Sequence, residues 1–497
     1  MRLPPRSIAA PAAALTLALA LAPRTARADG GYYTGALGAA AAGRAGAFTA
    51  KADDLTAVAY NPAGLAKIGG TIIQIGNRLS YNASAYTRAS TQDWGNPQGG
   101  VAPLVSFAEV RNSQPWQAAE PLLGVASNLG LRDWGFALAA YAPPGISRIS
   151  FPVDGGQKYQ MINREAIILN YTASAAWKLR DVFGIGATVQ WIHVPRLVYS
   201  LMIDGAGMPG GANPVSSPLD IQATTSGSDP FTFNAILGAW VRPVPAFEIA
   251  VSGQVVPTDI VTNSTLSVAF IDQTRGPLLL ARGGSPANDV RVTLPLPLLA
   301  RVGARYRHLA ADGRERWDIE LNVAYETWSR VQRFSVDTNG IEASYGPEIV
   351  PLSRIDIEKR WRDTVAVSLG GDVAVIPDKL TLRGGAFYET AVADPAYANV
   401  DFAGGAQMGG ALGGSLLVGR WQWMIAYQLR VQPRVNVTEA NGRVYQQVPD
   451  SACPAPYTDA TFCNPNYPGQ PSPTINGGTY HAASHFLLLA AIYRFAL

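Results

Sequence analysis

The sequence contains little charge. Charged residues make up 15% of its 497 residues, well below the ~25% of a typical globular protein. The formal net charge is only +3 and the basic residues are not massed in one region. This excludes the concentrated positive surface that a nucleic-acid-binding protein needs.

Residues and motifs typical of catalysis are also scarce. The four histidines are scattered along the chain, so neither a metal site nor a catalytic histidine is expected. The Gly-x-Ser-x-Gly turn of many hydrolases and the Walker-type phosphate loop are both missing from the sequence. We therefore expect no cofactor and no enzymatic activity.

Only two cysteines are present, Cys453 and Cys463, and both lie in a stretch rich in Pro, Asn and Asp. In an exported protein, two neighbouring cysteines most simply form a loop disulfide. A metal site would need further ligands, and no histidine lies close in sequence. The pair predicts a disulfide and an oxidising compartment.

Long apolar runs are missing beyond the start of the chain. Residues 8–22 form an apolar stretch that follows Arg2 and Arg6 and precedes Ala26-Arg27-Ala28. The stretch is shorter than the ~20 residues of a membrane-spanning helix. A positive start, a short apolar run and a small-x-small pattern predict a cleaved signal peptide over residues 1–28, rather than a membrane anchor.

Strict alternation of apolar and polar residues dominates the chain after residue 70. In one run, Ile319, Leu321, Val323 and Tyr325 alternate with Asp318, Glu320, Asn322 and Glu326. Similar runs occur near 247–255, 301–307, 364–375 and 421–430. A period of two residues is the pattern of β-strands with one apolar and one polar face.

These runs favour a membrane barrel over a soluble β-sandwich. They are about ten residues or longer and tend to carry Trp or Tyr near their ends, as lipid-facing strands do. We predict an all-β protein in which residues 70–497 form an antiparallel transmembrane β-barrel. It has about fourteen strands, with twelve or sixteen as alternatives, and short turns alternate with long extracellular loops.

A small-residue-rich stretch, residues 29–69, precedes the first strand-like run. It contains Gly43-Arg44-Ala45-Gly46, then Asp53-Asp54, then Asn61-Pro62-Ala63-Gly64. A barrel of this size would leave a water-filled lumen. We therefore predict that the stretch is a short helical hatch that plugs the lumen, with Arg44, Asp53 and Asp54 pairing with charges of the wall. The alternative is a disordered tail in the periplasm.

Several motifs resemble those of the FadL/TodX family of outer-membrane transporters. They are Tyr60-Asn61-Pro62-Ala63-Gly64, Tyr141-Ala142-Pro143-Pro144-Gly145, Leu294-Pro295 before Arg301-Val302-Gly303, Glu326-Thr327-Trp328-Ser329-Arg330, and Trp361-Arg362-Asp363-Thr364 with residues 380–385. Their order resembles the family over essentially the whole mature chain. The family's late S-P-V-P-D loop is replaced here by residues 389–394.

The resemblance implies a fourteen-stranded barrel with an N-terminal hatch. It also implies passive uptake of long-chain fatty acids or other hydrophobic compounds. The ligand would leave through a lateral opening at an inward kink of an early strand. The resemblance places Asn61, Pro62, Ala63 and Gly64 at the gate, against that kink.

Two arginines of the predicted lumen have two interpretations. Arg301 and Arg305 share a polar strand face and could bind a carboxylate head group. Alternatively they pair with Asp318 or Glu320 and brace the wall. The bracing role is the commoner one for such arginines.

The leading functional prediction is uptake of a hydrophobic small molecule across the outer membrane of a Gram-negative bacterium. Its partners would be the lipid bilayer, lipopolysaccharide and the barrel-assembly machinery, and the protein would be a monomer. The alternatives are a general diffusion porin for polar solutes and a surface enzyme or adhesin that works through the long loops.

Overall fold

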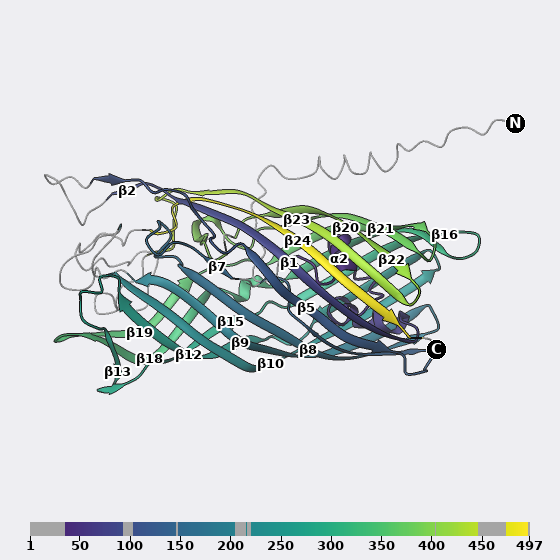
Figure 1. Cartoon of the computed structure of the whole chain (residues 1–497), viewed down its shortest axis with the longest axis horizontal. Helices are drawn as coiled ribbons and strands as arrows, with labels where there is room; N and C mark the ends of the chain where they lie inside the picture. The colour runs from purple at the N-terminus through teal and green to yellow at the C-terminus, as the bar shows by residue number, and fades with distance from the viewer. Residues whose placement is uncertain are drawn as a thin grey trace.

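Most of the described chain is β-strand, arranged as one elongated barrel (Figure 1). The computed structural model describes residues 35–92, 103–145, 148–203, 215, 220–402, 404–445 and 474–495. The predicted signal peptide and both cysteines lie outside the described residues. No helix in the described part of the chain is long and apolar enough to cross a membrane.

The barrel wall is a closed antiparallel sheet of 14 strands, as the sequence predicted. It closes where β1 pairs with β24 on one side and with β5 on the other. Ten wall strands are single elements: β1 (Thr71–Arg88), β5 (Trp116–Ser127), β6 (Trp134–Tyr141), β8 (Asn163–Leu179), β9 (Phe183–Ile203), β10 (Ile221–Val244), β21 (Leu380–Glu389), β22 (Gln407–Val418), β23 (Trp421–Val437) and β24 (Gly478–Arg494).

Four further wall strands are interrupted, each made of two elements that continue one another along the wall. Both elements of each pair hydrogen-bond to elements of the same neighbouring wall strand. The pairs are β11 (Phe247–Gln254) with β12 (Asp259–Phe270), β15 (Asp289–Pro295) with β16 (Leu299–Leu309), β17 (Glu315–Glu326) with β18 (Arg333–Tyr345), and β19 (Glu348–Glu358) with β20 (Thr364–Ile376).

Short elements occupy the connections. Tight turns join β8 to β9, β10 to β11, β20 to β21 and β22 to β23 at one end of the barrel, which we call the tight-turn end. The remaining elements are β2 (Thr91–Gln92), β3 (Leu104–Val105), β4 (Val110–Arg111), β7 (Ile149–Ser150), β13 (Leu279–Arg282), β14 (Ser285–Pro286), η3 (Trp328–Arg330) and η4 (Pro395–Tyr397).

The alternating sequence pattern separates the two faces of the wall. On β17, Ile319, Leu321 and Tyr325 are each more than 40% exposed on the outer face, whereas Asp318 and Glu320 are buried on the inner face. An apolar outer face and a polar inner face are what a barrel in lipid requires. The four histidines lie on this wall too: His193, His308 and His485 make ring contacts with Trp or Tyr, and His481 lies on β24.

The inner face changes character along the barrel axis. Near the tight-turn end it is polar, as at Gln190 of β9 and Asp372 of β20. Toward the opposite end it becomes mainly apolar, as at Val194 of the same β9 and Ile357 of β19, which continues β20. The buried ion pair of Lys359 and Asp401 lies beside Phe334 in this half. The apolar half forms one large buried cluster that includes Phe334, Trp361 and many aliphatic residues.

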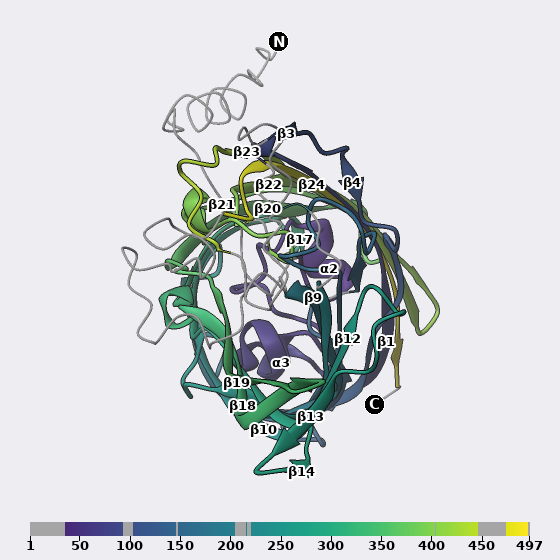
Figure 2. The ribbon, with the colours of Figure 1, turned by 90° about the vertical axis from the view of Figure 1, so that its left-hand side faces the viewer.

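The N-terminal segment (residues 35–69) lies within the ring of strands at the polar half. It contains α2 (Ala39–Gly43), α3 (Ala57–Tyr60) and the 3-10 helix η1 (Pro62–Lys67). Figure 2, a view along the barrel, shows α2 and α3 inside the ring. The small and apolar residues of the N-terminal segment pack against inward residues of β1, β5, β6 and β24.

Candidate functional site

The N-terminal segment has little regular structure of its own, and local hydrogen bonds define its turns. The Asn61 side chain accepts a hydrogen bond from the Ala63 amide at 3.1 Å and so caps η1, while Pro62 occupies the first helical position, where no amide donor is needed. Gly64 is close-packed, because a methyl group there would lie 2.0 Å from the Ala52 carbonyl oxygen.

The stretch Asn61-Pro62-Ala63 lies against β9 and β10. The Asn61 amide donates to the Thr49 carbonyl at 3.0 Å and to the Ala239 carbonyl of β10 at 3.2 Å. The Trp240 indole donates to the Ala63 carbonyl at 3.0 Å. The residues that contact the early strand β6 come later in η1, where Leu65 approaches Gly135. These contacts differ from the kink contact that the family resemblance implied.

Arg44 joins the segment to the opposite part of the wall. Its Nη1 lies 2.6 Å from Asp318 of β17 and 2.7 Å from Asp372 of β20, and its Nη2 lies 3.4 Å from Glu320. Burial opposes the charged guanidinium, but these carboxylates outweigh burial and hold the pKa of Arg44 above its ordinary value. All four side chains are at least nine-tenths buried, so the charges are shielded from solvent screening.

Backbone groups of the segment complete this connection. The amides of Ala50 and Lys51 donate to the Glu320 carboxylate at 2.8 and 3.1 Å, and the Lys51 ammonium lies 3.3 Å from Asp318. At the η1 end, Lys67 pairs with Glu248 of β11. The segment is therefore held to the wall by buried charges at both ends.

The two other predicted anchors act differently from Arg44. Asp53 is half-exposed and lies 3.4 Å from Lys51 of the same segment. Asp54 is buried, and its Oδ1 accepts hydrogen bonds from the amide and hydroxyl of Thr56. Burial raises the pKa of the Asp54 carboxyl above its ordinary value. Both aspartates line a polar cavity of about 210 Å³ at the tight-turn end.

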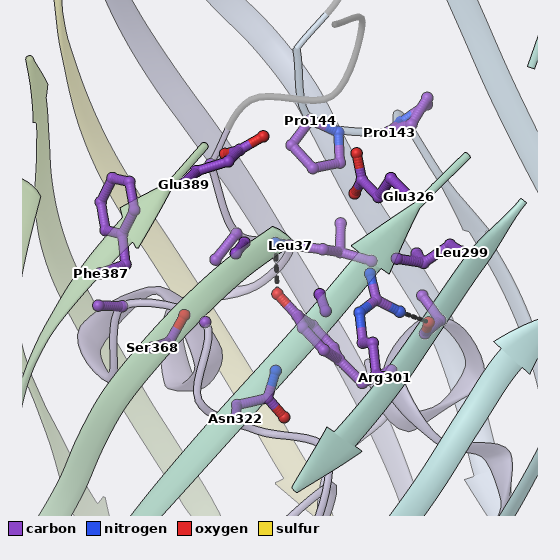
Figure 3. A pocket seen from close by; sticks show the side chains of 18 of the residues that line it. Leu37, Pro143, Pro144, Leu299, Arg301, Asn322, Glu326, Ser368, Phe387 and Glu389 are labelled. Carbon is purple, nitrogen blue, oxygen red and sulfur yellow. Dashed lines mark hydrogen bonds between the residues drawn. The ribbon is translucent and has the colours of Figure 1, made fainter. Parts of the chain in front are cut away.

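A second cavity, of about 160 Å³, lies on the other side of the segment. We call it the central cavity; Figure 3 shows its lining. The N-terminal segment contributes Leu37 and Tyr60, and the wall contributes residues that include Pro143, Leu299 and Phe387. The central cavity thus lies where the polar half of the lumen meets the apolar half.

The charged groups of the central cavity are balanced. Arg301 donates to the Ala59 carbonyl at 2.9 Å and its guanidinium lies 5.1 Å from the Tyr60 ring centre. Arg430 lies 3.0 Å from Glu389, and Glu326 accepts from the Trp328 indole at 2.6 Å. Two arginines and two glutamates give the lining no net formal charge.

Arg305 lies outside the central cavity. Its guanidinium pairs with Asp318 and Glu315, each at 2.5 Å, on the tight-turn side of the N-terminal segment. The structure therefore separates the two arginines that the sequence grouped: Arg301 lines the cavity, while Arg305 makes wall ion pairs.

The hydrogen-bonded wall is broken beside the central cavity. The ladder of β6 ends at Tyr141, which pairs with Leu122 of β5 and Asn170 of β8. Both neighbouring strands continue past this level, β5 to Trp116 and β8 to Asn163. The Ala142 amide donates one further hydrogen bond, to the Pro121 carbonyl at 2.9 Å. Pro143 and Pro144 follow and line the cavity; because proline has no amide donor, they cannot extend the ladder.

Leu37 and Pro144 separate the central cavity from a smaller one. Both residues line the central cavity and also a space of about 20 Å³ next to Ala142 of the broken strand. The ion pair of Arg78 and Glu120 lies beside this small space. A volume of 20 Å³ holds about one water molecule, so the passage beside the break is narrow here.

Sequence reasoning missed most of the cavity lining. Glu326, Glu389 and Arg430 come from three strands that the barrel brings together; the alternation placed Glu326 on a polar face, but nothing in the sequence indicated that the three residues meet. Pro143 and Pro144 were noticed only as part of a family-like motif. In the described part of the chain, no group of three or more His, Cys, Asp or Glu residues could hold a metal ion.

Comparisons with known proteins agree on one group. The sequence model of a family described as outer membrane protein transport protein (OMPP1/FadL/TodX) matches residues 19–401. A crystal structure of a Pseudomonas aeruginosa FadL homologue is similar at TM-score 0.71 and 16% identity, covering 94% of this chain and 100% of the other.

Two toluene transporters have a similar fold. The P. putida toluene transporter TodX superimposes at TM-score 0.60 with 14% identity, covering 93% of this chain and 99% of the other. The Ralstonia pickettii toluene transporter TbuX gives TM-score 0.58 and 14% identity, with coverage of 93% and 98%. No curated protein sequence matches this chain.

Proposed function

The chain belongs to the OMPP1/FadL/TodX family of outer-membrane transport proteins, and we propose that it admits small, uncharged hydrophobic compounds by passive diffusion. The family transports hydrophobic compounds through a β-barrel in the outer membrane of Gram-negative bacteria. Its members and the similar structures are transporters, not enzymes.

The change of the lumen from apolar to polar is the observation that carries the proposal. An apolar solute gains free energy in the apolar half, about 25 cal/mol for each Å² of surface that it buries. It would lose that gain among the buried charges around Arg44 and Asp318, which it cannot hydrogen-bond. An apolar solute is therefore favoured down to the central cavity and disfavoured beyond it.

The N-terminal segment is the plug of this pathway. It occupies the polar half, where Arg44, Glu320 and Lys67 tie it to the wall. We keep the boundaries expected from the sequence, with a signal peptide over residues 1–28 and a hatch over 29–69. Asn61, Pro62, Ala63 and Gly64 fix the shape of the hatch next to β9 and β10.

The break after Tyr141 is the exit. It lies at the level of the central cavity, so a solute halted by the polar half lies next to an interrupted part of the wall. The solute would pass Leu37 and Pro144 and enter the bilayer sideways. Because the small space beside the break is narrow, these side chains must move during each passage.

The size and charge of the central cavity favour a monoaromatic compound over a long-chain fatty acid. Its volume of about 160 Å³ is close to that of an engineered cavity of about 150 Å³ that binds benzene. Arg301 already donates to Ala59 and Arg430 is paired with Glu389, so a free carboxylate would have to displace an existing partner of either arginine. Two of the proteins with a similar fold are toluene transporters.

Accumulation of labelled toluene and labelled oleate, in cells with and without the gene, tests the proposal. We expect the gene to speed toluene accumulation and to affect oleate less. A larger effect on oleate would support the transport of hydrophobic compounds but would make a fatty acid, and not toluene, the preferred substrate. No effect on either compound would contradict the proposal.

A further inference from the structure

Small residues form a continuous row across five neighbouring wall strands, facing the N-terminal segment. The ladder registers place Gly135 of β6 opposite Ala176 of β8, Ala176 opposite Gly186 of β9, and Gly186 opposite Gly238 of β10. Ser252 of β11 continues the row opposite Gly238. We call these five residues the small-residue row.

The backbone of the segment lies directly on this row. A methyl group at Gly135 would lie 2.3 Å from the Leu65 carbonyl oxygen, and one at Gly186 would lie 2.5 Å from the Ala63 amide nitrogen. A methyl group at Gly238 would lie 2.1 Å from Oδ1 of Asn61. For each of the three glycines, the nearest atoms belong to the segment and not to the wall.

Hydrogen bonds hold the segment at this short distance. Ser252 donates to the Tyr60 carbonyl at 2.5 Å, and the Trp240 indole donates to the Ala63 carbonyl at 3.0 Å. A gap wide enough for water would have to be at least one water diameter, and contacts that leave no room for a Cβ exclude one. At these contacts no room is left for water between the segment and the wall.

A second contact of the same kind lies at the other end of the segment. A methyl group at Gly370 of β20 would lie 2.2 Å from the Arg44 carbonyl oxygen. Gly370 is the ladder partner of Glu320, which pairs with the Arg44 guanidinium. The ladder pair of Glu320 and Gly370 therefore contacts both the side chain and the backbone of Arg44.

We propose that the small-residue row and Gly370 are positioning residues that seat the N-terminal segment against the wall and seal the polar half of the lumen against ions. The inference rests on the proposed function only in treating the segment as a plug. The row acts through the segment and does not itself contact the transported compound.

Single-channel conductance in planar bilayers tests the seal, with Gly238→Ala as the variant. The added methyl group must displace the Asn61 side chain that lies against Gly238, so we expect a severalfold rise in conductance over the wild type. Gly384→Ala is the matched control, since a methyl group there would lie 3.6 Å from its nearest neighbour, Leu412. It should conduct like the wild type.

A double-mutant cycle with Asn61→Gly distinguishes a specific contact between Gly238 and Asn61 from general damage to the wall. Asn61→Gly removes the atom that the Gly238 methyl group would strike, so Gly238→Ala should add nothing further in that background. If Gly238→Ala alone fails to fold, the same cycle is read on the yield of heat-modifiable barrel, which Asn61→Gly should restore.

The inference is overturned if Gly238→Ala is as closed to ions as the wild type, or if its defect is undiminished beside Asn61→Gly. Hydrocarbon uptake by the wild type is a separate measurement. If Gly238→Ala conducts ions but the wild type takes up no toluene, the role of the small-residue row is supported and the proposed transport is overturned.

Discussion

Arg44 places a guanidinium nitrogen 2.6 Å from the carboxylate of Asp318, a residue 274 positions further along the chain. The contact joins the N-terminal segment to β17, and two more carboxylates surround the same guanidinium. Removing one partner from a buried ionic cluster leaves the others uncompensated. The segment therefore cannot leave the lumen as a body without a large cost in free energy.

Arg44→Met tests this connection. It keeps a long apolar side chain but removes the positive charge, so Asp318, Glu320 and Asp372 repel one another in a buried site. We expect a loss of about 3–5 kcal/mol in the free energy of unfolding, measured by urea denaturation of the purified protein. Arg314→Met at an exposed turn is the control and should change little. Equal stability of the two variants would argue against the anchor.

The Asn61-Pro62 pair tests whether the shape of the hatch matters for transport. Replacing both residues with alanine removes the cap on η1 and the hydrogen bond to Ala239, while the wall strands keep their own ladders. We expect altered toluene uptake with an unchanged heat-modifiable barrel band. Loss of the barrel band would instead mean that the pair is needed for folding.

Ala142 tests the lateral exit. Ala142→Trp places a bulky ring in the narrow space beside Pro144, where overpacking should close the passage. Toluene uptake should fall severalfold. Ala140→Trp is the control, because Ala140 lies two residues after the outward-facing Leu138 and so on the same, lipid-facing side of β6. A similar effect of both variants would contradict the lateral route.

Asp54 gives the pH-dependent prediction. Burial raises the pKa of its carboxyl above the ordinary value of 3.8; Asp53 raises it further, whereas Thr56 and Arg383 lower it. Folding therefore favours the protonated form of Asp54. The stability that this carboxyl contributes is complete below about pH 4 and is lost as the pH rises through its raised pKa. Asp54→Asn keeps the acceptor for Thr56 and does not titrate.

We therefore expect the thermal stability of Asp54→Asn, relative to the wild type, to increase from pH 4 toward neutral pH. Asp53→Asn, at the neighbouring half-exposed position, should not show this rise. A constant difference between Asp54→Asn and the wild type across this pH range would contradict the assignment.

The barrel could be predicted because its signal is local. On β17, apolar and polar residues alternate from Asp318 to Val323, so the inward position of Asp318 and the outward position of Ile319 can be read without knowing the neighbouring strands. The N-terminal segment was recognisable for a similar reason, since Asn61-Pro62 marks a turn in any context. In these parts, composition and short-range pattern determine the structure.

The site depends on strand register, which the sequence does not reveal. Arg44 meets Asp318 and Asp372 only because β17 and β20 pair at those two residues. Strand register also brings Gly186 and Gly238 together as ladder partners, although nothing in the sequence distinguishes them from other glycines. Arg301 and Arg305 look equivalent along one strand, and only the position of the segment separates them.

Toluene entry measured beside entry of a polar solute distinguishes a channel for hydrophobic compounds from an open pore. Cells that lack other transporters for hydrophobic compounds would be compared with and without the protein, using labelled toluene and labelled sucrose. We predict faster entry of toluene and unchanged entry of sucrose, because the apolar half of the lumen admits toluene and the N-terminal segment blocks sucrose. Unchanged toluene entry, or faster entry of sucrose, would contradict this prediction.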